Sequence, residues 1–178
     1  DIDPTAPGAE FWAIAPPSYV GSEPSWNSRN GGVYSTASTL DNLVTLSEKV
    51  SPASNFTIYW DGDLLCEMLD HEYIQKTETP VSVVISKWDY ENNKEVDLLN
   101  SKAIFSSNGT KGNPGLAADI LGDWRDEIIC RSSADDSKIR IYSTTIQTDY
   151  VVPCALENRA YREAVAWQNV GYNQPAHT

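Results

Sequence analysis

The chain has 178 residues, 40% of them hydrophobic and 21% charged, and its formal net charge at pH 7 is -12. This composition predicts one domain with a hydrophobic core and excludes a disordered chain, and no apolar run is long enough to span a bilayer. The negative charge argues against nucleic acid, whose phosphates need a basic face. The excess of carboxylates suits calcium, which takes hard oxygen ligands, but simple solubility also explains it.

The N-terminal segment, residues 1–12, combines an Asp-x-Asp loop with a glycine, a later acid and an apolar stretch. A tight turn of this kind places alternate side chains around one point, as calcium requires. We therefore expect Asp1, Asp3 and Glu10 to be candidate metal ligands, with Gly8 allowing the bend. The alternative is an Asp-rich turn that caps the following strand without metal.

The next segments carry signals of different strength. Residues 16–32 are rich in proline, serine, glycine and asparagine, which predicts a long surface loop. Residues 42–49 have weak helical spacing. Residues 81–88 predict a strand, and an Asn-rich turn at 91–94 leads into a second strand at 96–99, so we expect a hairpin.

A polar loop with a single cation follows at residues 106–112. Its asparagine and threonine can hydrogen-bond to sugar hydroxyls, and Lys111 can pair with a uronate carboxylate. An ordinary Asn-Gly turn explains the same residues without any ligand. The loop alone therefore favours no binding function.

A second acidic loop occupies residues 119–129 and repeats the plan of the first, with Gly122 allowing the bend. Its candidate calcium ligands are Asp119, Asp123 and either Asp126 or Glu127. Alternating residues then predict strands at 127–131 and 138–143, separated by a polar turn.

The C-terminal segment combines apolar, aromatic and amide side chains. Residues 164–170 are predicted as a strand. The polar residues at and beyond its end are Gln168, Asn169, Tyr172, Asn173 and Gln174. Aromatic faces beside amide groups suit a carbohydrate, and a core tryptophan next to a polar loop is the alternative.

The acidic loops recur at a nearly constant period. They start at Asp1, Asp61 and Asp119, 60 and 58 residues apart, and the middle copy, residues 60–65, is shorter. Several short strands in each repeat predict an all-β fold built from β-propeller blades. About three blades fit this length, so we expect residues 1–178 to be a single partial propeller region, a fragment of a larger propeller.

Four stretches resemble the rhamnogalacturonan lyases of polysaccharide lyase family 11, in that family's order and near its spacing. They are residues 1–12 (DIDPTAPGAEFW), 107–111 (SNGTK), 118–127 (ADILGDWRDE) and 166–175 (AWQNVGYNQP). The last two are long and specific. The likeness spans nearly the whole chain, but only the later part of the family's catalytic propeller.

The resemblance implies a secreted, extracellular enzyme with an eight-bladed propeller and bound calcium, which cleaves the rhamnose–galacturonate backbone of pectin by elimination. It implies Lys111 as the catalytic base or charge stabiliser. The substrate-binding residues that it implies are Asn108, Gly109, Thr110, Asn169 and Tyr172. The acidic loops correspond to calcium-binding turns, with Asp1, Asp3, Glu10, Asp119, Asp123 and Glu127 as the expected ligands.

Two other interpretations stay open. The chain could be a non-catalytic carbohydrate-binding or scaffolding fragment of such an enzyme, or a calcium-stabilised structural propeller repeat. The expected partner is the pectic polysaccharide rhamnogalacturonan I, with either the remaining part of the propeller or another copy of the chain. Nucleic acid and membrane are not expected as partners.

Overall fold

A computed structural model gives the fold and describes residues 1–15, 30–39, 41–47, 56–71, 82–107, 112–168 and 170. The described residues form two compact units. The first unit is drawn from residues 1–53 and 88–96, and the second from residues 54–87 and 97–178. Among these residues, no helix has the length and apolar character needed to cross a lipid bilayer.

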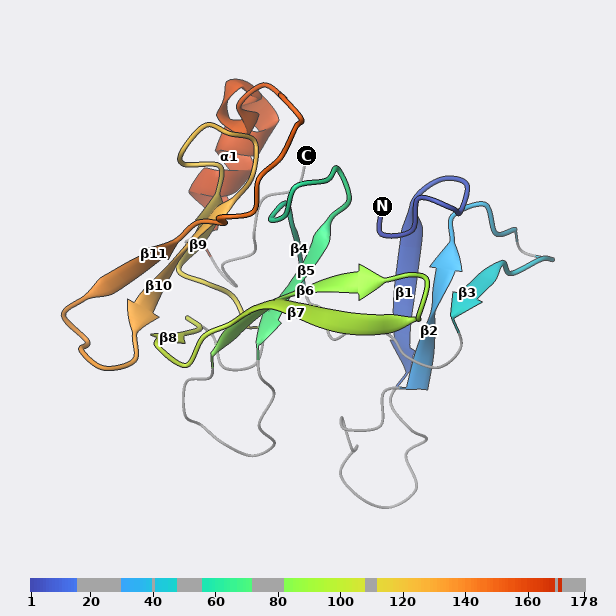
Figure 1. Ribbon diagram of the computed structural model, residues 1–178, viewed down its shortest axis with the longest axis horizontal. Coiled ribbons are helices and arrows are strands. Elements are labelled where there is room, and N and C mark those ends of the chain that lie inside the picture. Colours follow the sequence, from blue (N-terminus) through green and yellow to red (C-terminus); the bar gives the residue numbers. More distant parts are fainter. Residues whose placement is uncertain are drawn as a thin grey trace, which may run out of the picture. The chain divides into compact units, whose positions relative to one another are not determined.

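The first unit contains an antiparallel sheet of three strands in the order β1-β2-β3 (Figure 1). The strands are β1 (Glu10–Ala15), β2 (Asn30–Ser35) and β3 (Thr45–Ser47). The weak helical pattern at residues 42–49 was therefore misleading, because its described part contains β3. Similarly, the end of the loop predicted at residues 16–32 is the start of β2, and residues 16–29 lie outside the described part.

A four-stranded sheet has the order β4-β5-β6-β7, shown in green tones in Figure 1, and its residues belong to the second unit except for those within 88–96. Its strands are β4 (Phe56–Ile58), β5 (Glu67–His71), β6 (Val83–Asp89) and β7 (Lys94–Asn100). Strands β6 and β7 confirm the predicted hairpin. Asn93 in its turn has a φ of 51°, a left-handed conformation that asparagine tolerates better than most residues.

The remaining sheet of the second unit is centred on β10 and has the order β11-β10-β8, with β9 also paired to β10. Its strands are β8 (Ile104–Phe105), β9 (Leu116–Ala118), β10 (Glu127–Ser132) and β11 (Ile139–Tyr142). Strands β10 and β11 confirm both predictions for this region. All three sheets are antiparallel, so the β architecture is as expected, whereas their arrangement as propeller blades stays a prediction.

The hydrophobic core of the second unit is assembled from both of its sheets. The buried residues are Phe56, Ile58, Trp60, Leu69, Val83, Ile85, Ile104, Ala117, Ile128 and Cys130. Leu98, Leu99 and Tyr142 pack against this cluster from partly buried positions. Burying each large apolar side chain contributes about 1.5–3 kcal/mol, so this cluster stabilises the unit substantially.

The C-terminal segment is helical, so the strand predicted at residues 164–170 is wrong. A 3-10 turn, η1 (Ala155–Glu157), leads into the helix α1 (Arg159–Trp167). The Asn158 side chain caps the helix by accepting hydrogen bonds from two backbone N–H groups at 2.8 and 3.3 Å. Alanine-rich sequence and an Arg159–Glu163 ion pair one turn apart favour the helix further.

Candidate functional site

The acidic turns share one backbone plan in all three copies. Glu10, Glu67 and Glu127 each begin a strand, namely β1, β5 and β10. The Oε2 atom of each accepts hydrogen bonds from two consecutive backbone N–H groups six to eight residues earlier, at 2.7–3.2 Å. We call residues 1–10, 60–67 and 119–127 the first, second and third acidic turns. Their common geometry gives a physical basis to the sequence repeat.

The first acidic turn leaves one carboxylate oxygen available. Glu10 Oε1 is buried and has no hydrogen-bond partner. Asp3 is also buried, and its Oδ1 atom accepts from the backbone N–H and the hydroxyl of Thr5 at 2.9 and 2.6 Å. Asp1 is exposed. Because buried polar atoms normally have a partner, the bare oxygen of Glu10 fits a cation ligand.

The second acidic turn gathers its acids more tightly than the other two. Oxygens of Asp61, Asp63 and Glu67 lie within 4.8 Å of one another, and neither predicted ligand set reaches that density in the described part of the chain. The ammonium group of Lys87, on β6, bonds to all three carboxylates. Burial raises the pKa of Glu67 to about 7.

The third acidic turn again leaves an oxygen available. Asp119 is 0% exposed, and its Oδ1 atom has no hydrogen-bond partner, while Oδ2 accepts from the backbone N–H of Ala155 at 2.7 Å. Asp123 pairs with the Arg125 guanidinium at 2.7 Å. Burial raises the pKa of Glu127. Gly122 has a φ of 79°, as its predicted role in the bend requires.

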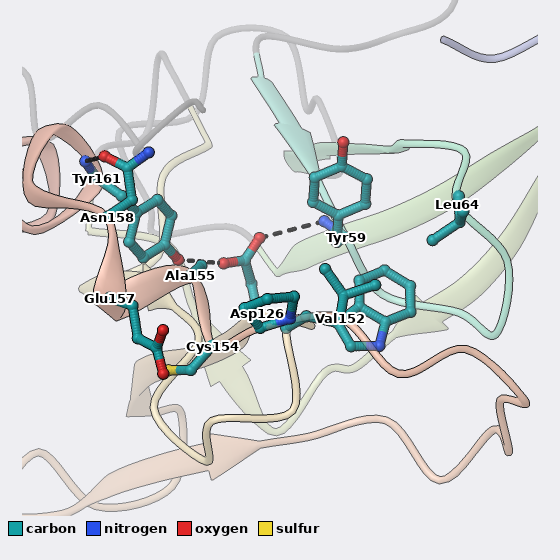
Figure 2. Close-up of a pocket in the computed structure, with 11 residues that line it drawn as sticks. Tyr59, Leu64, Asp126, Val152, Cys154, Ala155, Glu157, Asn158 and Tyr161 are labelled. Carbon is teal, nitrogen blue, oxygen red and sulfur yellow. Dashed lines mark hydrogen bonds between the residues drawn. The ribbon is translucent and has the colours of Figure 1, made fainter.

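Asp126 has a separate role from Glu127. Its Oδ1 atom accepts from the Tyr161 hydroxyl at 2.5 Å, and Oδ2 accepts from the backbone N–H of Tyr59 at 3.1 Å (Figure 2). The Tyr161 hydroxyl also accepts from the backbone N–H of Asp119 at 2.8 Å. Burial raises the pKa of Asp126 to about 6. Asp126 thus joins α1 to the third turn.

A pocket of about 600 Å³ opens beside this network. Tyr59 and Trp124 meet in it edge to face, with ring centroids 5.7 Å apart. Trp124 has a φ of 72°, which is strained for a bulky residue, and its indole N–H is buried without a partner. Aromatic faces, a strained residue and nearby carboxylates together are typical of a binding site.

The residues expected to act on substrate lie outside the described part of the chain. They are Asn108, Gly109, Thr110, Lys111, Asn169 and Tyr172. The ends of the loop are fixed, because Ser107 donates its backbone N–H to the Asn113 carbonyl at 2.7 Å. Gly112 has a φ of 70°, and a Cβ there would lie 2.5 Å from His71 Nδ1. Sequence analysis missed this buried histidine, which carries no motif.

The C-terminal segment also starts from a fixed point. The Gln168 side chain donates to the Ala117 carbonyl at 2.6 Å and accepts from the Ala117 N–H at 2.9 Å. Gln168 is buried, so its expected place among the sugar-facing amides is wrong. The residue that precedes position 169 is therefore held on β9 by its side chain. Tyr161 was likewise missed, and its only signal was an aromatic residue in the first turn of α1, three residues after the Asn158 cap.

Comparison with known proteins gives a consistent result. The model for the family described as rhamnogalacturonan lyase family 11, C-terminal domain, matches residues 1–178. The rhamnogalacturonan endolyase YesW of Bacillus subtilis is 40% identical over 178 residues, covering 100% of this chain and 23% of the relative. The exolyase YesX of the same organism is 38% identical, covering 99% of this chain and 26% of the relative.

Solved structures agree. The crystal structure of the exotype lyase YesX has a TM-score of 0.78 at 38% identity, covering 99% of this chain and 27% of that chain. A Bacillus licheniformis rhamnogalacturonan lyase has a TM-score of 0.75 at 39% identity, covering 100% of this chain and 25% of that chain. The chain spans about a quarter of the length of the relatives that it matches.

Proposed function

Because the chain belongs to rhamnogalacturonan lyase family 11, whose C-terminal domain it matches throughout, we propose that it contributes to a calcium-dependent lyase that cleaves rhamnogalacturonan in pectin by β-elimination. The family match over the whole chain carries this proposal. Two relatives named as rhamnogalacturonan lyases, one an endolyase and one an exolyase, support it. Both are far longer than this chain, so substrate and activity are proposed for the whole protein.

The reaction needs a base and a way to stabilise negative charge. The base removes the C5 proton of galacturonate, the electron pair forms the C4=C5 double bond, and the C4–O bond breaks with protonation of the leaving oxygen. Lys111 is proposed as the base or the charge stabiliser. Service as a base requires burial or nearby positive charge to lower its pKa.

The remaining proposed contacts lie next to described residues that are held by hydrogen bonds. Asn108, Gly109 and Thr110 belong to the loop whose ends the Ser107–Asn113 hydrogen bond closes. Asn169 and Tyr172 follow Gln168, which is held on β9. Fixing the residues next to a substrate-binding segment limits the entropy lost when substrate binds, which supports this assignment.

Calcium is proposed as the cofactor. When bound, it would supply positive charge that offsets the substrate carboxylate and the acidic protein surface. The proposed ligands are Asp1, Asp3 and Glu10 in the first turn, and Asp119, Asp123 and Glu127 in the third. The bare buried oxygens of Glu10 and Asp119 support these two turns.

The wider organisation is part of the same proposal. We propose that the three antiparallel sheets are blades of an eight-bladed propeller, completed by further sequence or by another copy of the chain. An extracellular location is proposed because the polymeric pectic substrate is itself extracellular.

Ultraviolet absorbance tests the proposed activity directly, because the new C4=C5 double bond absorbs. The full polypeptide is mixed with rhamnogalacturonan in calcium and then in chelator. We expect absorbance to rise only with calcium, and Lys111→Ala to reduce the rate by roughly 10²–10⁴-fold, the usual contribution of a general base. A flat trace beside an active YesW control would contradict lyase activity.

Carbohydrate binding without chemistry is the second candidate function, and the pocket beside Tyr59 and Trp124 favours it. Its test is tryptophan fluorescence during titration with rhamnogalacturonan oligosaccharides under conditions without turnover. Binding that Trp124→Phe weakens would support this function. Binding that depends on Lys111 but not on Trp124 would instead locate the sugar at the proposed active site.

A further inference from the structure

A protein cation sits where the second acidic turn would otherwise hold a metal ion. The Lys87 ammonium donates to Oδ2 of Asp61, to Oδ2 of Asp63 at 2.6 Å and to Oε1 of Glu67 at 3.3 Å. An ammonium group has three N–H donors. Each donor therefore has one carboxylate, and the three acids surround the ammonium as they would surround an ion.

Every carboxylate oxygen of this turn has a donor from the protein. Besides the bonds from Lys87, Asp61 Oδ1 accepts from the Asp63 N–H at 2.9 Å, and Asp63 Oδ1 accepts from the Leu65 N–H at 2.9 Å. Glu67 Oε2 accepts two backbone N–H groups at 2.7 and 3.0 Å. All six oxygens are thus satisfied without metal, unlike Glu10 and Asp119 in the other turns.

We infer that Lys87 is the built-in cation of the second acidic turn, and that this turn needs no metal to fold. A divalent ion cannot join the cluster while Lys87 remains, because calcium needs six to eight oxygens and would repel the ammonium. Removing the lysine charge leaves three carboxylates with one free oxygen each. The turn then becomes a site for a hard divalent cation such as calcium.

Burial and charge support this assignment. The Lys87 side chain is only 23% exposed, and that of Glu67 is 0% exposed. Burial alone lowers the pKa of Lys87, but hydrogen bonds with Asp61 and Asp63 outweigh it and raise the pKa. The ammonium is therefore charged at neutral pH. The inference goes beyond the proposed function and holds whether or not the protein cleaves pectin.

Calcium counting by isothermal titration calorimetry of the full polypeptide at pH 8, above the pKa of Glu67, tests the inference. The variants are Lys87→Met, Asp61→Asn and the double variant. The charge control is Lys138→Met, because the Lys138 side chain is 71% exposed and pairs only at the surface. We expect Asp61→Asn and Lys138→Met to bind as many ions as the wild type. We expect Lys87→Met to bind one more, and the double variant to lose it.

Two results would overturn the inference. Loss of an ion in Asp61→Asn would mean that a metal already occupies the second turn beside Lys87. A folded Lys87→Met protein with an unchanged ion count would mean that the turn is not a latent cation site. Circular dichroism establishes folding, and if Lys87→Met does not fold, the comparison of wild type with Asp61→Asn still decides whether the turn holds metal.

Discussion

The second and third acidic turns share one backbone plan but differ in how their carboxylate oxygens are satisfied. Both cap the turn with a strand-initiating glutamate that accepts two backbone N–H groups. In the second turn Lys87 satisfies the remaining oxygens, whereas in the third turn Asp119 keeps a bare buried oxygen. The backbone plan therefore does not determine how the carboxylate oxygens are satisfied, and an acidic repeat by itself does not predict a metal.

Removal of Lys87 should cause the largest loss in the free energy of unfolding, because it takes away the cation that distinguishes the second turn from the third. Lys87→Met leaves three neighbouring carboxylates without their cation, and breaking a buried ion pair costs about 3–5 kcal/mol. Because Asp63 is partly exposed, we expect about 3 kcal/mol, measured by urea unfolding in chelator. Lys138→Met should stay within about 1 kcal/mol of wild type. Equal losses in both variants would contradict a special role for Lys87.

The third turn depends instead on the tyrosine that joins it to α1. Tyr161→Phe removes the donor to the buried Asp126 and the acceptor of the Asp119 N–H. We expect a loss of about 2 kcal/mol in the free energy of unfolding, since hydrogen bonds to charged groups contribute about 1.5–3 kcal/mol. Tyr150→Phe, at an exposed position, is the matched control and should change little.

The pH dependence of stability should distinguish the two turns, because each loses stability over a different range of pH. A carboxyl group with a raised pKa in the folded state stabilises the fold at low pH and loses that contribution as pH rises through the folded pKa. The window for Asp126 runs from its usual 3.8 to about 6, and that for Glu67 from 4.5 to about 7.

In chelator, urea unfolding across pH 3.5–8 should therefore show stability falling through both windows, by on the order of 3 kcal/mol for each group. Glu67→Gln should flatten the upper part of the curve and Asp126→Asn the lower part. A curve that Glu67→Gln leaves unchanged between pH 6 and 7 would show that Lys87 holds Glu67 ionised.

The smallest effect is expected at the helix cap next to the third turn. Asn158→Ala removes the side chain that accepts from the Ala160 and Tyr161 N–H groups, and should cost about 1 kcal/mol. Asn158→Asp keeps the acceptor and should restore stability. Thermal unfolding followed by circular dichroism measures the stability of both variants. If the cap matters only for α1, neither substitution should affect the second turn.

Sequence patterns predicted correctly the strands that are specified by neighbouring residues along the chain. Alternation and turn residues were sufficient for β10, β11 and the β6–β7 hairpin. The helix α1 was missed because Ala164, Val165 and Trp167 also suit a strand, and the decisive signals were the Asn158 cap and the Arg159–Glu163 pair. Spacing located the acidic turns for the same reason, since each is a continuous segment.

The contents of the site depended on contacts that spacing does not encode. Lys87 lies 20 residues from Glu67 along the chain, and a lysine in a strand normally indicates a solvent-facing position. Asp126 and Glu127 are adjacent, so sequence could not assign their different partners, which come from Tyr161 and from the turn backbone. Gln168 is buried because Ala117 offers it both a donor and an acceptor.

The bond between Gln168 and Ala117 also bears on self-association. Strand β9 pairs with β10 along one edge, and Gln168 occupies the backbone N–H and carbonyl of Ala117, the middle residue of this three-residue strand. Unpaired strand edges recruit strands from other molecules and start aggregation. A single amide side chain therefore occupies the backbone groups that a neighbouring strand would otherwise bind. This leaves few free groups on β9 for fibril-like growth.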